Sequence, residues 1–459
     1  MKRTAFRLLA AASLWLVALG AASAEERPRY GGTLRVQMKE AVLSFDPTDD
    51  KELTAARTRL AFLIFDRLTQ IDDQGRVRPQ LAWSWTSDAE HKTWRFTLRS
   101  GVLFHDGTQL SGAHVVGHFA RANDPRWQVR LGNGPQVVVF ECANPIYDLP
   151  AILASPRYSV VLHAEKPEGT GPFRVESWQP GRQLLLAANL DYFEGRPYLD
   201  AVDIQMGNSL RDQVIDARLD RDELLEVDIE QALRLQSARQ RVDTSSPSRL
   251  LALVFRTQNP ALRELLARSI DRNAIHAAIL KKSGSPAVSL LPQWLTGYAV
   301  LMNDVPDPAR LQKLRSDLSK AAPLYLAFDP SDPLNKAIAD RIAVNARDVG
   351  LTVQVFGEKN LSASSRADAL LFTFPAPSAN STQALIELAE AAQVDQNDVL
   401  SAGSPEDLFV AEDSLLGAYR VAPIAHLPVT VWLSTRIRNW KTLPEGRWRL
   451  EQVWLDSVK

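Results

Sequence analysis

The chain has 459 residues, with 53 Lys and Arg against 54 Asp and Glu, and a single Cys. This balance argues against nucleic-acid or anionic-membrane partners, which attract clustered positive charge. One Cys cannot form an internal disulfide, so stability must come from buried apolar side chains, with Cys142 expected among them. The chain is too long for one core and should form two or more domains.

The first 24 residues have the pattern of a secretory signal peptide. They contain three cations, an apolar run and a small tripeptide: Lys2, Arg3 and Arg7, then Leu8 to Leu19, then Ala22-Ser23-Ala24. We expect cleavage after Ala24 rather than a transmembrane anchor, because the apolar run is shorter than the roughly 20 residues that span a bilayer. No Cys follows the run to carry a lipid anchor, and 435 residues with a formal charge of −4 remain.

Alternating side chains and turns dominate the N-terminal half. A strand is expected over Thr33 to Met38, and a helix over Leu53 to Phe65. In Thr93 to Arg121, a strand with Trp94, Phe96 and Leu98 on one face is followed by an Asp106-Gly107 turn and an amphipathic helix carrying Val115, Val116 and Phe119. These short elements predict a mixed sheet domain.

Strands are also predicted beyond this stretch, with a short helix starting at Leu149 to Leu153. The strands are Val137 to Phe140, Phe173 to Trp178, Gln183 to Ala188 and Ala201 to Met206. Gly169-Thr170-Gly171 before them lacks the Lys-Ser/Thr and the following helix of a phosphate loop. We therefore interpret it as a tight turn.

The C-terminal half has an α/β pattern. An apolar run at Leu251 to Phe255 precedes one long predicted helix, Ala261 to Leu280. A strand, helix and strand follow at Leu324 to Phe328, Pro333 to Val349 and Leu351 to Phe356, with Gly350 ending the helix. Later elements are strand Ala369 to Phe374, helices Thr382 to Ala392 and Pro405 to Tyr419, and strand Val429 to Leu433. The change in pattern between the halves suggests two lobes.

No motif supports an enzyme. His114 and His118 lie four apart on one expected helix, near His105, a spacing that can hold a metal. However, no His-Glu-x-x-His pattern occurs, so a partly solvated helix face is favoured and no metal is expected. The chain also lacks a Gly-x-Ser-x-Gly elbow.

Tryptophans mark candidate core and candidate binding positions. Trp83, Trp85 and Trp94 fall in sheet-like contexts, where core packing is expected. Trp294 and Tyr298 follow Pro292 in a loop-like stretch, where their large apolar area and polar tips suit ligand contact.

Several stretches resemble the extracellular solute-binding proteins of the peptide, dipeptide and nickel type that serve ABC importers. TWRFTLRSGVLFHDGTQLSGAHVVGHFAR resembles that family's signature region. Three further stretches match in order and approximate spacing: YGGTLRV with SFDP, GTGPFRVESWQPGRQLLLAANLDYFEGRPYLDAV, and LRELLARSIDRNAIHAAIL. The resemblance covers most of the chain after residue 24.

The resemblance implies an α/β, two-lobe periplasmic-binding-protein fold with a ligand cleft between the lobes. Lobe I would comprise residues 25–250 with an additional subdomain, lobe II residues 251–426, and residues 427–459 would return to lobe I. The subdomain is expected to be trimmed, because fewer residues separate Arg121 from Gly169 than in family members.

Ligand contacts are expected from both lobes. The residues are Phe45, Trp294, Tyr298, Phe372, Thr373 and Phe374. Peptide-binding members often carry an Asp in the second lobe that pairs with the peptide's α-amino group, but the matching stretch LLFTFPAPSAN has Thr373 or Phe374 there. Loss of that carboxylate should weaken peptide binding.

The predicted function is the periplasmic substrate-binding component of an ABC importer. It would capture a small solute, oligopeptide- or dipeptide-like or related, by hinge closure, and deliver it to a membrane permease as a monomer without a cofactor. Two alternatives stay open: a sensor or interaction protein on the same fold that has lost transport, and a secreted metal-dependent hydrolase using His105, His114 and His118.

Overall fold

The computed structural model describes most of the chain after the N-terminus. The described residues are 27–47, 54–122, 124–162, 168–207, 215, 221–298, 307–361, 366–374, 380–392, 394–395, 397–443 and 447–456. The predicted signal peptide, residues 1–24, lies outside them. In the described residues, the strands form three larger sheets and two two-stranded ribbons.

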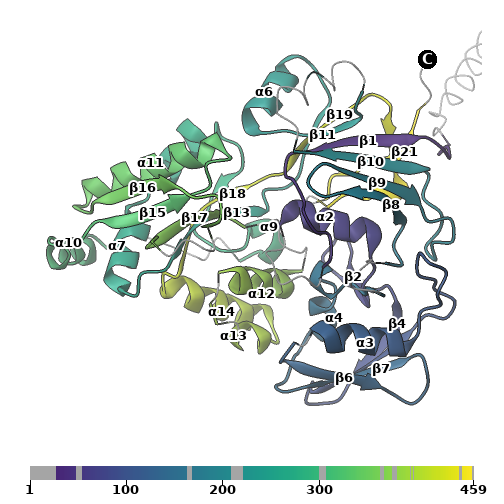
Figure 1. Ribbon diagram of the computed structural model, residues 1–459. Coiled ribbons are helices and arrows are strands. Elements are labelled where there is room, and N and C mark those ends of the chain that lie inside the picture. The colour runs from purple at the N-terminus through teal and green to yellow at the C-terminus, as the bar shows by residue number, and fades with distance from the viewer. Residues whose placement is uncertain are drawn as a thin grey trace, which may run out of the picture.

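A seven-stranded mixed sheet contains strands from both ends of the chain (Figure 1, upper right). Its order is β12 (Val242–Thr244), β19 (Thr430–Leu433), β11 (Leu224–Glu226), β1 (Thr33–Met38), β10 (Ala201–Met206), β9 (Gln183–Ala188) and β8 (Phe173–Gln179). β1 pairs in parallel with both β10 and β11. Helix α2 (Ala55–Ile64) shares a buried core with this sheet, and α6 (Ile229–Ser237) contacts β19.

A six-stranded mixed sheet forms the other side of the molecule (Figure 1, left). Its order is β14 (Ser285–Pro286), β18 (Val421–Leu427), β13 (Arg249–Phe255), β17 (Ala369–Thr373), β15 (Leu324–Phe328) and β16 (Val353–Gly357). The predicted strand–helix–strand unit is confirmed as β15, α11 (Pro333–Asp348) and parallel β16. Asp332 caps α11 through the Leu334 N–H (3.0 Å), and Pro333 fills its first turn.

Seven further helices surround this sheet or lie below the place where the two large sheets meet (Figure 1). They are α7 (Pro260–Ser269), α8 (Arg272–Ala274), α9 (Gln293–Thr296), α10 (Pro308–Asp317), α12 (Ser381–Ala391), α13 (Asn397–Leu400) and α14 (Pro405–Gly417). Helix α7 shares the core of the six-stranded sheet with α11. Helices α12 to α14 contribute to another core, described next.

A four-stranded antiparallel sheet forms a subdomain with two helices (Figure 1, lower right). Its order is β4 (Ala82–Ser87), β5 (Thr93–Leu98), β7 (Val137–Cys142) and β6 (Trp127–Leu131), and its helices are α3 (Gly112–Ala122) and α4 (Leu149–Ile152). As predicted, Trp94, Phe96 and Leu98 are buried. One apolar core joins this subdomain to α12 and α14, so the subdomain is packed against helices that lie between strands β17 and β18 of the six-stranded sheet.

Two short ribbons and two 3₁₀ turns are also present in the described residues. The ribbons pair β2 (Thr69–Ile71) with β3 (Val77–Pro79) and β20 (Ile437–Arg438) with β21 (Trp454–Leu455), and 3₁₀ turns span Pro156–Tyr158 and Leu450–Gln452. Cys142 is buried, as expected, and burial raises the pKa of its thiol to about 12.

The predicted single helix from Ala261 to Leu280 is wrong. Helix α7 ends at Ser269, and Ile270 is extended. The Asp271 carboxylate then caps α8 by accepting the Ala274 N–H at 2.9 Å, and a π-helical turn spans Ile275–Ile279. The apolar spacing continues through this break, whereas an Asp side chain favours a new N-terminus.

The expectation that Trp83 packs in the core is also wrong. Trp83 is 56% exposed, while Trp94 is buried and Trp85 packs against the core. The pairing of β4 with β5 shifts register between Ala82 and Ser84. Such an irregularity changes which face a side chain occupies, so simple alternation fails at Trp83.

The glycines of the Gly169-Thr170-Gly171 stretch permit a close approach of two backbones. The Gly171 N–H donates to the Ile64 carbonyl (3.0 Å), and a Cβ atom at Gly171 would lie only 2.6 Å from that oxygen. The stretch therefore packs against the end of α2, a structural role consistent with the predicted turn.

Candidate functional site

Two segments connect the seven-stranded sheet with the six-stranded sheet. The chain passes from β12 to β13 through residues 245–248 and returns from β18 to β19 through Pro428 and Val429. The segments are hydrogen-bonded side by side: the Ser245 N–H donates to the Val429 carbonyl, and the Val429 N–H to the Ser245 Oγ, both at 2.9 Å. These crossings lie close to the predicted lobe boundaries at 250/251 and 426/427, which themselves stay a prediction.

The carboxyl ends of parallel strands from both sheets meet beside these crossings. Lys39 directly follows β1, Asp332 follows β15, and their side chains form an ion pair at 3.3 Å. In open α/β sheets, ligands bind outside the carboxyl ends of the strands. We therefore take this region, hereafter the junction, as the candidate binding site.

Six charged residues form the junction: Lys39, Glu40, Arg59, Glu226, Arg249 and Asp332. Arg59 on α2 forms an ion pair with Glu226 at the end of β11, and both side chains are largely buried. Glu226 also accepts the backbone N–H of Lys39 at 3.1 Å. Burial and, to a smaller extent, repulsion from Arg249 together lower the pKa of Arg59 to about 10.

Glu40 lies at the N-terminus of α2. Burial raises the pKa of its carboxyl group, while hydrogen bonds from the Thr54 side chain and the Ala56 backbone and the charge of Arg59 oppose that shift. An anion at a helix N-terminus also interacts favourably with the helix dipole. The Glu40 carboxyl group thus already has hydrogen-bond partners, Thr54 and Ala56, at the start of α2.

Arg249 begins β13 immediately after the first crossing. Its Nη2 donates to the Pro428 carbonyl (2.8 Å) on the second crossing, and its Nε is buried without a hydrogen-bond partner among the described residues. Burial lowers the pKa of its guanidinium, and attraction to Asp332 and Glu40 opposes this. Arg249 is therefore a partly buried cation beside both crossings.

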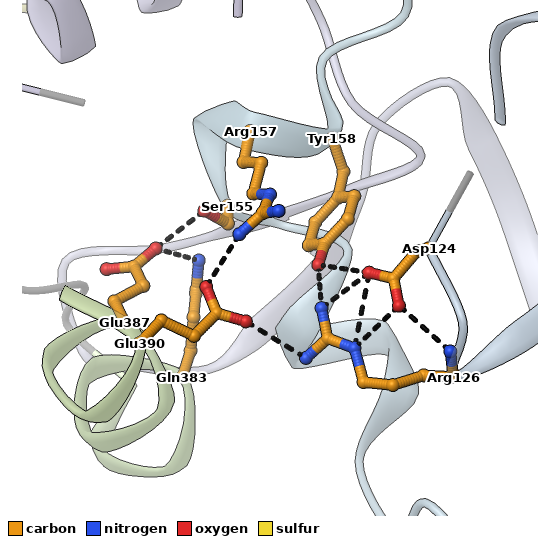
Figure 2. A network of polar contacts seen from close by, with 8 residues as sticks. All are labelled: Asp124, Arg126, Ser155, Arg157, Tyr158, Gln383, Glu387 and Glu390. Carbon is orange, nitrogen blue, oxygen red and sulfur yellow. Dashed lines mark hydrogen bonds and ion pairs between the residues drawn. The ribbon is translucent and has the colours of Figure 1, made fainter. Parts of the chain in front are cut away.

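A second polar contact joins α12 to the subdomain, away from the crossings (Figure 2). Glu390 on α12 pairs with Arg157 (2.9 Å) and Arg126 (3.3 Å), and Glu387 accepts the Ser155 hydroxyl at 2.6 Å. Asp124 holds Arg126 from the opposite side at 2.6 Å. We call this the α12 contact; it links segments more than 200 residues apart in sequence.

Some of the sequence-predicted ligand residues lie beside the crossings. Trp294 is 38% exposed and donates from Nε1 to the Pro247 carbonyl at 2.7 Å, on the first crossing. Thr373 pairs with Leu251 of β13, and the Phe374 N–H donates to the Leu250 carbonyl. Phe374 is buried and packs against Phe372, with their ring centroids 4.8 Å apart.

The other two predicted residues have partners within their own lobes. Phe45 is buried in the core of the seven-stranded sheet, with its ring against Phe65 and Trp178. The Tyr298 hydroxyl donates to the buried carboxylate of Glu412 (2.8 Å), and its ring contacts Phe409. A role in ligand binding stays a prediction for all six residues.

The three histidines have backbone or local partners. The His118 Nδ1 accepts the Val161 N–H (3.3 Å) in the core, where burial lowers the pKa of the ring to about 3. The His105 ring bonds the Gly171 carbonyl, and His114 bonds Ser111. Among the described residues, no three His, Cys, Asp or Glu side chains are grouped to hold a metal ion.

Sequence reasoning did not single out Arg249, Arg59, Glu226 or the α12 contact. These charged residues stand in no recognised motif spacing. Their significance follows from pairing across the sheets, which single-sequence periodicity does not reveal.

The topology defines a two-lobe α/β protein of the solute-binding type. A sequence profile described as "Bacterial extracellular solute-binding proteins, family 5 Middle" matches residues 76–382, well over half of the chain. The chain therefore belongs to this family, as the sequence motifs indicated, and the family comprises binding proteins.

Curated relatives match over parts of their length. An uncharacterized protein, YhjP of Bacillus subtilis (strain 168), is 36% identical over 178 residues, covering 36% of this chain and 30% of YhjP. The oligopeptide-binding protein AppA of the same strain is 30% identical, covering 38% and 37%. The probable D,D-dipeptide-binding periplasmic protein DdpA of Escherichia coli (strain K12) is 24% identical, covering 63% and 64%. The chain thus spans about a third to two-thirds of the length of these relatives.

Solved structures confirm the predicted fold. DppA from Helicobacter pylori, in complex with the peptide STSA, has a TM-score of 0.79 at 19% identity, covering 95% of this chain and all of that one. NikA from Staphylococcus aureus, with Ni(L-His)2, has a TM-score of 0.77 at 17% identity, covering 92% and 100%. Identities this low establish the fold alone. Within the described residues, no helix is long and apolar enough to cross a bilayer.

Proposed function

We propose that the protein is the periplasmic substrate-binding component of an ABC importer. It captures a small solute between its two lobes by closing about the paired crossings and delivers it to a membrane permease. The observation that carries this proposal is the pair of hydrogen-bonded crossings beside the facing carboxyl ends of both sheets. Two adjacent crossings allow rotation of the lobes about one axis with little change within either sheet.

Peptide-like solutes are the first class to test. The relatives named above are oligopeptide- and dipeptide-binding proteins, and the DppA structure holds a peptide. However, the end of β17 offers Thr373 and a buried Phe374 in place of the amine-pairing Asp expected in peptide-binding members. The ligand is therefore related to peptides in size, but its anchoring differs.

Native mass spectrometry of gently purified protein, residues 25–459, tests the proposal. We expect a co-purified small molecule, which on re-addition at 100 times its Kd should stabilise the protein by about 2.7 kcal/mol in thermal unfolding. If no bound molecule is found and no peptide, sugar, opine or metal chelate raises the Tm, the proposal is wrong. Unchanged solute uptake but altered signalling in a deletion strain would instead favour the sensor alternative.

The α12 contact should stabilise the closed form. Glu390→Gln removes the carboxylate shared by Arg126 and Arg157, whose side chains are 12% and 50% exposed. Partly exposed pairs contribute about 1 kcal/mol, so we expect roughly fivefold weaker ligand binding by calorimetry. Asp340→Asn, which breaks the exposed Lys336–Asp340 pair on α11, is the matched control and should leave affinity unchanged. If the two variants changed ligand affinity equally, the α12 contact would not be a contact that stabilises the closed form.

A further inference from the structure

Arg249 differs from the other cations of the junction in its partners. Lys39 is paired with Asp332, and Arg59 with Glu226. The guanidinium of Arg249 has five N–H donors, yet the structure records one hydrogen bond for it, to a neutral carbonyl. In the described residues, no carboxylate lies within ion-pair distance of it.

The carboxylates around Arg249 are already engaged elsewhere. Asp332 accepts the Leu334 N–H of α11 and pairs with Lys39. Glu226 is bound by Arg59 and by the Lys39 backbone, and Glu40 by Thr54 and Ala56. Glu40 and Asp332 attract Arg249 only through longer-range Coulomb interaction. A partly buried guanidinium with donors to spare can form charge-assisted hydrogen bonds to a further anionic partner without giving up its bond to Pro428.

The position of Arg249 makes the ligand the natural source of that partner. It directly follows the first crossing, donates to the second, and its neighbours Glu40 and Asp332 come from opposite lobes. A group held here would therefore contact both lobes and would lose its water on closure. In a water-poor site, a guanidinium binds a carboxylate through short, paired hydrogen bonds.

We propose that Arg249 anchors a negatively charged group of the ligand, such as a carboxylate, at the base of the junction. This inference rests on the proposed function and specifies its substrate class: an anionic small solute recognised by its acid rather than by a free amine. The absence of a carboxylate at Thr373 and Phe374 agrees with this preference.

Matched acid and amide probes test the anchor. Dipeptides, N-acetylated dipeptides and the C-terminal amides of both would be titrated by calorimetry, together with the co-purified molecule. We expect the N-acetylated acids to bind and their amides to bind roughly 10- to 150-fold more weakly, the range for a lost hydrogen bond to a charged group. If the amides bound as tightly as the acids, the proposal that Arg249 anchors an acidic group of the ligand would be wrong.

Variants at Arg249 separate anchoring from folding. Arg249→Gln should abolish the preference for acids, while Arg249→Lys should retain part of it because it keeps the charge but loses the planar fork. Removal of a partly buried cation that has no ion-pair partner among the described residues should leave the Tm of the ligand-free protein unchanged or higher, whereas a structural role would lower it. Arg234→Gln, at an arginine side chain 78% exposed on α6, is the control and should bind as the unaltered protein does.

The outcomes distinguish this inference from the proposed function. If ligands bind and close the protein without regard to an acidic group, or if Arg249→Gln keeps the acid preference, the anchor is wrong while substrate binding stands. If neither the probes nor any co-purified molecule binds, both proposals fail.

Discussion

Glu226→Gln should destabilise the protein by about 3–5 kcal/mol, because it removes the largely buried carboxylate that forms an ion pair with Arg59. The two side chains are only 13% and 7% exposed, and burial already lowers the pKa of Arg59 to about 10. Urea denaturation followed by tryptophan fluorescence measures the change. The effect should be largest in the half of the molecule that contains the seven-stranded sheet, since both residues belong to it.

The protein offers a matched control for this pair. Glu230 and Arg234 form a Glu–Arg pair on α6 whose side chains are 61% and 78% exposed. Glu230→Gln should change stability by less than about 0.5 kcal/mol, because water already solvates both charges. Replacing the buried pair together, as Glu226→Leu with Arg59→Met, should recover much of the loss. Equal effects of Glu226→Gln and Glu230→Gln would contradict the burial assigned to the junction.

Phe96→Ala should cost about 3–5 kcal/mol of stability, the usual range for removing a fully buried aromatic ring. Phe96 on β5 has no exposed surface, and its ring packs edge-on against Phe140 at 5.5 Å. Its core also contains residues of α12 and α14. The variant should therefore loosen the α12 contact as well as the subdomain, which hydrogen exchange of α12 amides would detect.

Trp83→Ala is the control on the neighbouring strand. Trp83 is 56% exposed, so removal of its ring should change stability by less than about 0.5 kcal/mol although Trp is the larger residue. A large loss at Trp83 with little at Phe96 would mean that the faces of the four-stranded sheet are assigned the wrong way round.

Local periodicity predicted the elements whose burial follows a regular pattern. Strand β5 alternates buried and less buried side chains, and α11 buries Ile338, Ala339 and Ile342 on one face. Both were expected from the sequence because one face of each meets a core and the other does not. The motifs around β5 also led to the correct family.

The sequence pattern did not predict elements that lack one buried and one exposed face. Strand β18 is buried at all seven positions and contains Pro423, so it shows neither alternation nor ordinary strand composition. The break at Asp271 and the exposure of Trp83 depend on a cap and on a register shift, which an apolar pattern does not record.

The residues of the candidate site were harder to predict from the sequence than the helices and strands. Trp294 and the end of β17 were chosen from the sequence and do lie beside the crossings. Arg249, by contrast, is a single charged residue before an apolar strand. Its environment is created by Pro428, Asp332 and Glu40, which lie far from it in sequence.

The central claim is that ligand binding closes the two lobes about the paired crossings. Spin labels at Arg130→Cys on β6 and Val410→Cys on α14, both exposed positions, would report the distance between the subdomain and α14. Cys142 would be replaced by Ala. Pulsed electron–electron double resonance should give a broad distribution of label-to-label distances without ligand. With the co-purified molecule, the distribution should be narrower and its mean distance shorter. An identical distribution in both states, at saturating ligand, would contradict closure.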